Sequence, residues 1–259
     1  MEESDSALGY ILSGMIFYIF GLKWCYEYAK FWPRHPRDQD SEREVSKLLQ
    51  FSKWCQGFLR RHPLEGTLKL LATALGLASA LTRNLSNITT VSPKVVHATT
   101  ICLFFALSGL VDVLTFYFPN VVGNGLGNMA LAQSFFVEGL LFFWATPFNG
   151  VIIILAGIVW TTSLTIVLEL VWPDMKLLRA ASTLLHGGWL AHMVRSYHIT
   201  DIESSGRIAL IFSWHLAAAF VVTLCIVSIT RSCAPKVRPT EPPEIPIYDY
   251  CHLMDHHRV

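Results

Sequence analysis

Charge is scarce in this sequence. Only 15% of its 259 residues are Asp, Glu, Lys or Arg, whereas soluble domains carry about 25%. Hydrophobic residues make up 53% of the chain and stand in long blocks rather than in amphipathic stripes. A helix that crosses a hydrocarbon core of about 30 Å needs about 20 such residues. The sequence therefore predicts an all-α polytopic membrane protein. The net charge of +1 argues against nucleic acid as a partner.

Several signals that would point to other classes are also missing. The start Met1-Glu2-Glu3-Ser4-Asp5 is acidic, whereas a secretory signal peptide begins with a positive region, so we expect the first block to stay as a signal anchor. No span contains an HxxxH, HExxH or CxxC spacing. The third and seventh blocks lack the Asp-Arg-Tyr and Asn-Pro-x-x-Tyr motifs of G-protein-coupled receptors. We assign no metal and no cofactor.

The apolar blocks predict a seven-helix transmembrane domain over residues 1–230. The spans are expected at residues 7–31, 64–81, 95–118, 126–145, 149–172, 175–197 and 207–230. In the second span, Ala72, Gly76 and Ala80 recur every fourth residue, a small-residue pattern that lets another helix approach closely.

Lys and Arg residues near the span ends predict the orientation. They gather in the connector 32–63 and in the tail 231–259, and basic connectors stay in the cytosol. The N-terminus is then lumenal or extracellular and the C-terminus is cytosolic. Two sequons, at Asn84 and Asn87, fall in a connector predicted to be lumenal, and both are candidates for glycosylation. No cysteine falls in a lumenal connector, so no structural disulfide is expected.

The tail is proline-rich and polar, and its composition predicts disorder. Tyr250 and Leu253 fit the pattern Y-x-x-φ, in which φ is a bulky apolar residue. Sorting adaptors read this pattern in cytosolic tails, so they are candidate partners besides the lipid bilayer. A solvated tail without a partner is the alternative.

Ionisable residues inside the spans are the candidate functional residues, because each costs about 2.5–3.5 kcal/mol at mid-bilayer. They are His97, Asp112, Glu138, Glu169, His186, His192 and His215. At about 1.5 Å per residue, we expect Asp112 and Glu169 near the cytosolic side and the other five to converge in the lumenal half. For Glu138, the expected partner is His186 or His215.

Three interpretations of this set stay open: interhelical hydrogen bonding, a proton or ligand site, and a metal site. Ser108 and Asp112 share a helix face, so a nucleophile–acid pair is a fourth interpretation and a local hydrogen bond is its alternative. The corresponding functions are a non-catalytic role in membrane trafficking or organisation, an intramembrane lipid hydrolase, and a proton-linked transporter.

Five segments carry a resemblance to a known family. They are Gly14-x-x-Phe17-x-x-x-Gly21-Leu22-x-Trp24, His97 with Leu103-Phe104-Phe105-Ala106-Leu107-Ser108-Gly109-Leu110-Val111-Asp112, Phe136-Val137-Glu138-Gly139-Leu140-Leu141-Phe142, Leu168-Glu169 and Ser213-Trp214-His215. In this order they resemble the transmembrane protein 45 family over most of residues 9–230. The resemblance implies seven spans in Golgi, endosomal, lysosomal or surface membranes, and it implies no established reaction. The sequence departs from the family at residues 144–150, where relatives carry a His-rich connector.

Overall fold

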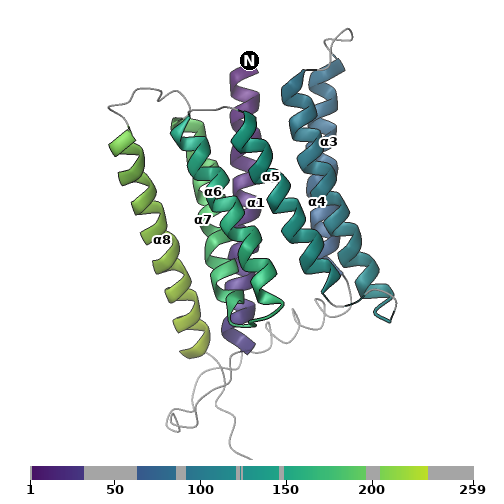
Figure 1. Cartoon of the computed structure of the whole chain (residues 1–259), viewed down its shortest axis with the longest axis vertical. Helices are drawn as coiled ribbons and strands as arrows, with labels where there is room; N and C mark the ends of the chain where they lie inside the picture. Colours follow the sequence, from purple (N-terminus) through teal and green to yellow (C-terminus); the bar gives the residue numbers. More distant parts are fainter. Residues whose placement is uncertain are drawn as a thin grey trace, which may run out of the picture.

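The computed structural model describes residues 2–31, 63–85, 92–120, 123, 125–145, 149–196 and 205–232, and all regular secondary structure in these ranges is helical (Figure 1). The helices are α1 Glu2–Phe31, α3 Leu64–Leu85, α4 Pro93–Tyr117, α5 Leu126–Ala145, α6 Gly150–Glu169, α7 Met175–Ser196 and α8 Ser205–Ser232. The all-α prediction is confirmed. Most of the connector 32–63, the sequon residue Asn87, and the tail with Tyr250 and Leu253 lie outside the described residues.

Helix ends follow local sequence signals. Helix α6 begins after Asn149, whose side chain accepts a hydrogen bond from the Val151 N–H at 3.0 Å, as N-cap residues do. It ends at Glu169, four residues before Pro173 and earlier than the predicted 172. Helix α3 continues to Leu85 rather than 81, so Asn84 lies in its last turn and not in the connector where it was expected.

Six of the helices are long and apolar enough to cross a membrane: α1, α3, α4, α5, α6 and α8. Helix α7 is the exception, because Lys176, Arg179, His186 and His192 lower its hydropathy. It is nevertheless enclosed by protein, since it packs against α1, α6 and α8, and Leu184, His186 and Trp189 are buried. A helix shielded from lipid by its neighbours does not need an apolar surface all round.

The helices lie side by side, with α3 and α4 at one edge and α8 at the other (Figure 1). The most extensive contact joins α1 to α7, followed by the hairpins α3–α4 and α5–α6. The chain order places the C-terminal ends of α1, α4 and α6 and the N-terminal ends of α3 and α7 at the lower end of Figure 1. We call this the lower end of the bundle; the sequence predicts that it faces the cytosol.

Glycines permit the closest helix contacts. A Cβ atom added to Gly187 of α7 would lie 2.5 Å from the carbonyl oxygen of Gly14 in α1. In the α3–α4 hairpin, a Cβ on Gly66 would lie 2.8 Å from the carbonyl oxygen of Gly109, and one on Gly76 would lie 2.7 Å from Cys102 Sγ. The predicted small-residue face of α3 therefore packs on α4 at Gly76.

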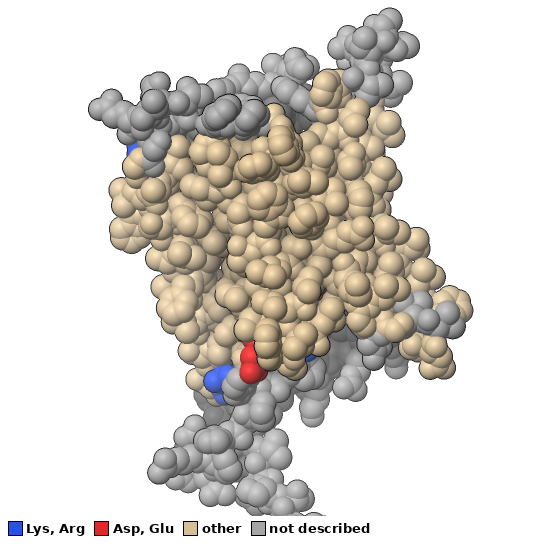
Figure 2. Space-filling model, viewed as in Figure 1, with Lys and Arg blue, Asp and Glu red and all other residues tan. Residues whose placement is uncertain are grey.

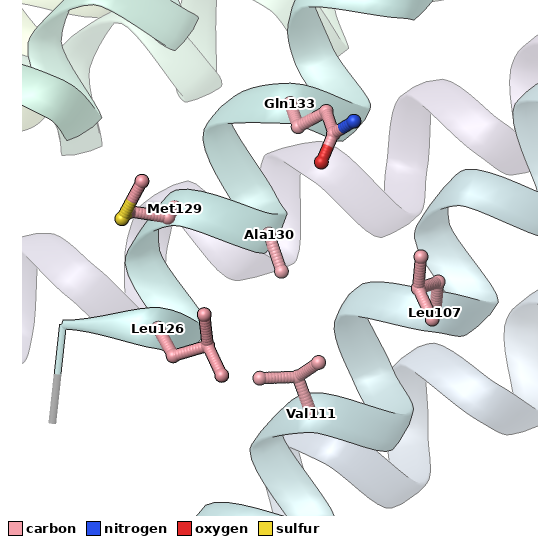
Figure 3. Close-up of a pocket in the computed structure, with 6 residues that line it drawn as sticks. All are labelled: Leu107, Val111, Leu126, Met129, Ala130 and Gln133. Atoms are coloured by element: carbon pink, nitrogen blue, oxygen red, sulfur yellow. The ribbon is translucent and has the colours of Figure 1, made fainter. Parts of the chain in front are cut away.

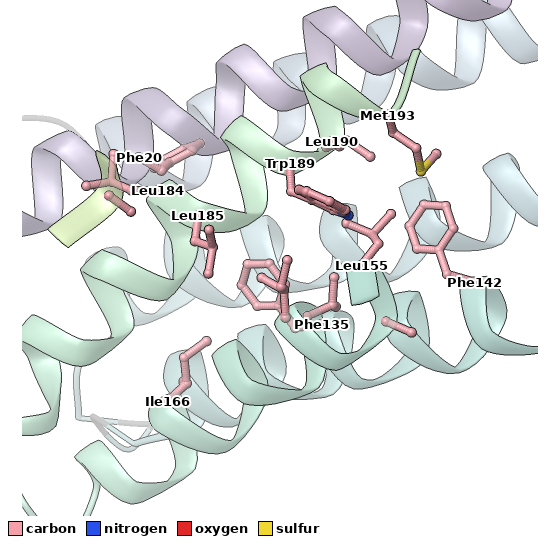
Figure 4. Packing of buried hydrophobic residues seen from close by; sticks show 14 of the residues in the cluster. Phe20, Phe135, Phe142, Leu155, Ile166, Leu184, Leu185, Trp189, Leu190 and Met193 are labelled. Carbon is pink, nitrogen blue, oxygen red and sulfur yellow. The ribbon is translucent and has the colours of Figure 1, made fainter. Parts of the chain in front are cut away.

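The hydrophobic core lies mainly between α5, α6 and α7 (Figure 4). Phe135, Leu155 and Trp189 fill its centre and are fully buried. The indole N–H of Trp189 donates to the carbonyl oxygen of Val151 at 3.1 Å, which satisfies the one polar atom of that side chain.

Candidate functional site

The ionisable residues expected to converge occupy separate places in the bundle. His97 and Asp112 lie on α4, Glu138 on α5, Glu169 on α6, His186 and His192 on α7, and His215 on α8. Glu138 pairs with His186, His192 lies against His215, and His97 packs edge-on against Phe142 at 5.4 Å between ring centroids. The expected single cluster of His97, Glu138, His186, His192 and His215 is not formed.

The first pair, Glu138 and His186, lies inside the bundle between α5 and α7. Glu138 Oε1 is 3.6 Å from His186 Nε2, and the side chains are 3% and 0% exposed. This distance is too long for a hydrogen bond. Within the described part of the chain, Glu138 Oε2 and both imidazole nitrogens have no hydrogen-bond partner. His186 thus lies beside Glu138, as predicted, but neither nitrogen of its ring has a hydrogen-bond partner among the described residues.

Aromatic side chains lie against the imidazole of this pair. Phe17 of α1 stacks on the His186 ring at 4.3 Å between centroids, and Phe135 of α5 approaches it edge-on at 5.8 Å. A carboxyl group and an imidazole in such surroundings lack the hydration they would have in water. Chemically, the pair can hold or pass a proton.

The second pair, His192 and His215, joins α7 to α8. Their ring centroids are 4.9 Å apart, and Trp189 lies 5.7 Å from the first ring and 5.5 Å from the second. His186 and His192 are six residues apart, which is about 240° around a helix, so the two imidazoles face different neighbours. That rotation explains why the expected cluster divides. Within the described ranges, no three His, Cys, Asp or Glu side chains come together as metal ligands would.

Asp112 and Glu169, expected near the cytosolic side, lie at the lower end of the bundle and are both paired. Asp112 Oδ2 accepts a hydrogen bond from Lys69 Nζ at 2.6 Å. Glu169 Oε2 lies 2.8 Å from Arg179 Nη1. Ser108, by contrast, is buried and its Oγ has no partner among the described residues, so it does not form the nucleophile–acid pair with Asp112.

These two ion pairs belong to a larger charged network. Lys69 also lies 3.4 Å from Glu65, and Glu65 forms an ion pair with Lys23 of α1, which lies 3.4 Å from Glu27. Trp24 connects these residues to the Arg179–Glu169 ion pair. Its indole N–H donates to Glu65 Oε2 at 3.4 Å, and its ring lies 4.3 Å from the Arg179 guanidinium. We call the following residues the charged belt: Lys23, Glu27, Glu65, Lys69, Asp112, Glu169 and Arg179.

The charged belt links α1, α3, α4, α6 and α7 at one end of the bundle. On the face shown in Figure 2, the charged side chains stand near the ends of the bundle and the middle is free of them. Sequence reasoning missed Lys23, Glu65 and Lys69 as site residues. The available signal was that all three lie within predicted spans, at the depth of Asp112.

Two grooves are present on the outer surface of α4, α5 and α6, and neither is lined by Glu138 or His186. The first, of about 450 Å³, is lined by Leu107, Val111, Leu126, Met129, Ala130 and Gln133 (Figure 3). The second, of about 290 Å³, is lined by Met129, Ala132, Gln133, Phe136, Ser163, Val167 and Leu170.

A comparison with models of known protein families finds no match for the chain. The helices establish a multi-pass, membrane-type helical protein.

Proposed function

We propose that this protein has a non-catalytic role in membrane trafficking or membrane organisation. The observation that carries the proposal is the charged belt. Lys69–Asp112 and Arg179–Glu169 are close ion pairs between different helices, so these charges fix helices to one another. A charge placed in a membrane span is usually functional or paired, and here Asp112 and Glu169, two of the candidate functional residues, are paired.

The tail supplies the test of this proposal. The full chain, carrying a fluorescent label, is expressed with residues 250–259 deleted, or with Tyr250→Ala, and its membrane compartment is determined by microscopy. Both changes are expected to move the protein to a different compartment, because they remove the Y-x-x-φ pattern. Tyr248→Ala is the matched control, since Tyr248 has Cys251 rather than a bulky apolar residue three positions on. If the deletion variant is found in the same membrane compartment as the wild type, the trafficking role is contradicted.

Proton-linked transport is the second candidate, and the Glu138–His186 pair favours it. A buried acid lies 3.6 Å from a buried imidazole, and among the residues that the structure describes Glu138 Oε2 and both imidazole nitrogens have no hydrogen-bond partner. This arrangement resembles a proton-holding site more than a structural link. In vesicles containing a pH-sensitive dye, the purified protein is expected to pass protons down a pH gradient, and Glu138→Gln is expected to stop this. His192→Gln, outside the pair, serves as the control. Equal flux in wild type and Glu138→Gln contradicts the candidate.

Membership of the transmembrane protein 45 family is part of the same proposal, with Golgi, endosomal, lysosomal or surface membranes as the compartment. The resemblance of the third and fourth spans supports it. The lipid hydrolase has less support, because Asp112 is engaged by Lys69 rather than by Ser108.

A further inference from the structure

One polar side chain stands on the membrane-facing surface of α5. Gln133 is exposed, whereas Ala132 and Ser134 on either side of it are buried. It is the eighth residue of α5, about 10 Å from the start of the helix, which places it within a hydrocarbon core of about 30 Å. Acyl chains cannot hydrogen-bond a carboxamide, so a polar residue at this depth is normally satisfied by another helix. No hydrogen bond to its side chain is made within the described part of the chain.

Two grooves flank Gln133 on the outer surface. Met129 and Gln133 lie one helical turn apart and line both surface grooves. One groove lies on the α4 side of these two residues, as Figure 3 shows, and the other lies on the α6 side. Met129 and Gln133 therefore form a ridge between two grooves, which we call the docking ridge. Helices pack by inserting the ridge of one into the groove of another, and a two-fold contact requires a surface that complements itself.

We propose that a second copy of this chain docks on the docking ridge, with the two Gln133 side chains hydrogen-bonded to each other across a two-fold axis. A carboxamide carries two N–H donors and a carbonyl acceptor, so two carboxamides can pair through two reciprocal hydrogen bonds, one N–H donating to one carbonyl oxygen in each direction. An acyl chain would fill the apolar grooves but would leave the amide unpaired. The chemistry of Gln133 thus selects a second copy over a lipid as the occupant.

The test is energy transfer between donor-labelled and acceptor-labelled full-length protein in phosphatidylcholine vesicles, measured over a range of protein-to-lipid ratios. Wild type is expected to associate. Gln133→Leu is expected to weaken the association at least about threefold, and up to about 20-fold for each hydrogen bond lost. Gln133→Asn keeps the amide and is expected to retain part of the association. Met129→Ala removes half of the ridge and is expected to weaken the association as well.

Matched controls separate this contact from general effects of the substitutions. Thr161 is exposed on α6, but its hydroxyl donates to Gly157 in its own helix at 2.8 Å, so Thr161→Val is expected to associate as wild type does. Leu210 on α8 is 60% exposed, and Leu210→Ala is also expected to have no effect. Gln133 and Met129 are themselves exposed, so their substitution is expected to leave the fold intact.

Three results would overturn the proposal. They are a wild-type protein that stays monomeric at every density, an association unchanged in Gln133→Leu, and an association that Leu210→Ala weakens equally. Native mass spectrometry adds a fourth: a monomer that retains a lipid in wild type and loses it in Gln133→Leu assigns the grooves to lipid instead.

Discussion

At the residue scale, buried polar groups of two kinds lie in the bundle, and they differ in whether they have partners. Lys69 is 6% exposed and its ammonium group meets the Asp112 carboxylate at 2.6 Å. Glu138 and His186 are at least as deeply buried, yet Glu138 Oε2 and both His186 nitrogens have no hydrogen-bond partner within the described part of the chain. Paired charges stabilise each other's burial, whereas an unpaired buried group costs about 1–3 kcal/mol. The two kinds should therefore respond in opposite ways to substitution by an apolar residue.

Lys69→Met is expected to destabilise the protein by about 3 kcal/mol, because it leaves the Asp112 carboxylate without its cation. The measurement is the free energy of unfolding in mixed micelles titrated with a denaturing detergent. The double variant Lys69→Met with Asp112→Leu removes both charges and is expected to recover most of the loss. Lys30→Met, at an exposed lysine of α1, is the control. A double variant as unstable as the single one would mean that the ion pair is not the cause.

Glu138→Met is expected to leave stability unchanged or to raise it by about 1–3 kcal/mol, because it replaces an unpaired buried acid with an apolar side chain of similar size. The same unfolding measurement applies. A loss of stability comparable with that of Lys69→Met would show that Glu138 holds the helices together, and it would remove the support for proton transport.

At the element scale, α1 and α7 form the closest packed pair, and glycine makes this possible. Besides the Gly14 oxygen, a Cβ on Gly187 would meet the backbone N of Tyr18 at 2.5 Å. Backbone atoms cannot rotate aside as a flexible side chain does, so the helices themselves would have to separate. This close contact covers one side of α7, which has the lowest mean hydropathy of the described helices.

Gly187→Ala is therefore expected to lower the free energy of unfolding by about 1–3 kcal/mol, the usual cost of overpacking. The matched control is Gly157→Ala in α6, where nothing lies within 4 Å of an added Cβ. There the better helix propensity of alanine is expected to raise stability by up to about 1 kcal/mol. Equal effects of the two substitutions would contradict the close approach of α1 and α7.

The long apolar blocks were enough to predict the helices, and α5 has the bounds Leu126–Ala145 that the sequence indicated. The Glu138–His186 neighbourhood was also predictable, because both residues fall at mid-span. The separation of the expected cluster into different contacts was not predictable, because it depends on how each helix is rotated about its axis. The cluster comprised His97, Glu138, His186, His192 and His215. The charged belt was missed because its pairs are distant in sequence, as Lys69 and Asp112 are, and depth alone does not say which charges meet.

At the scale of the whole molecule, the helices form a bundle whose polar residues are sorted by position. The charged belt ties five helices together at the lower end, the Glu138–His186 pair lies in the interior, and Gln133 stands on the outer surface. Apolar side chains such as Leu103, Phe136 and Leu210 cover the outside, as a lipid environment requires. In this arrangement α7 is expected to cross the membrane together with the six helices that are long and apolar enough to do so.

The topology of the chain tests this expectation most directly. Short epitope tags are placed at the N-terminus and the C-terminus of the full chain, and the access of antibodies is compared before and after selective permeabilisation of the cell surface. Seven crossings put the two tags on opposite sides of the membrane, with the C-terminal tag reached only from the cytosol. Finding both tags on the same side would mean that α7 does not cross, and it would contradict the account.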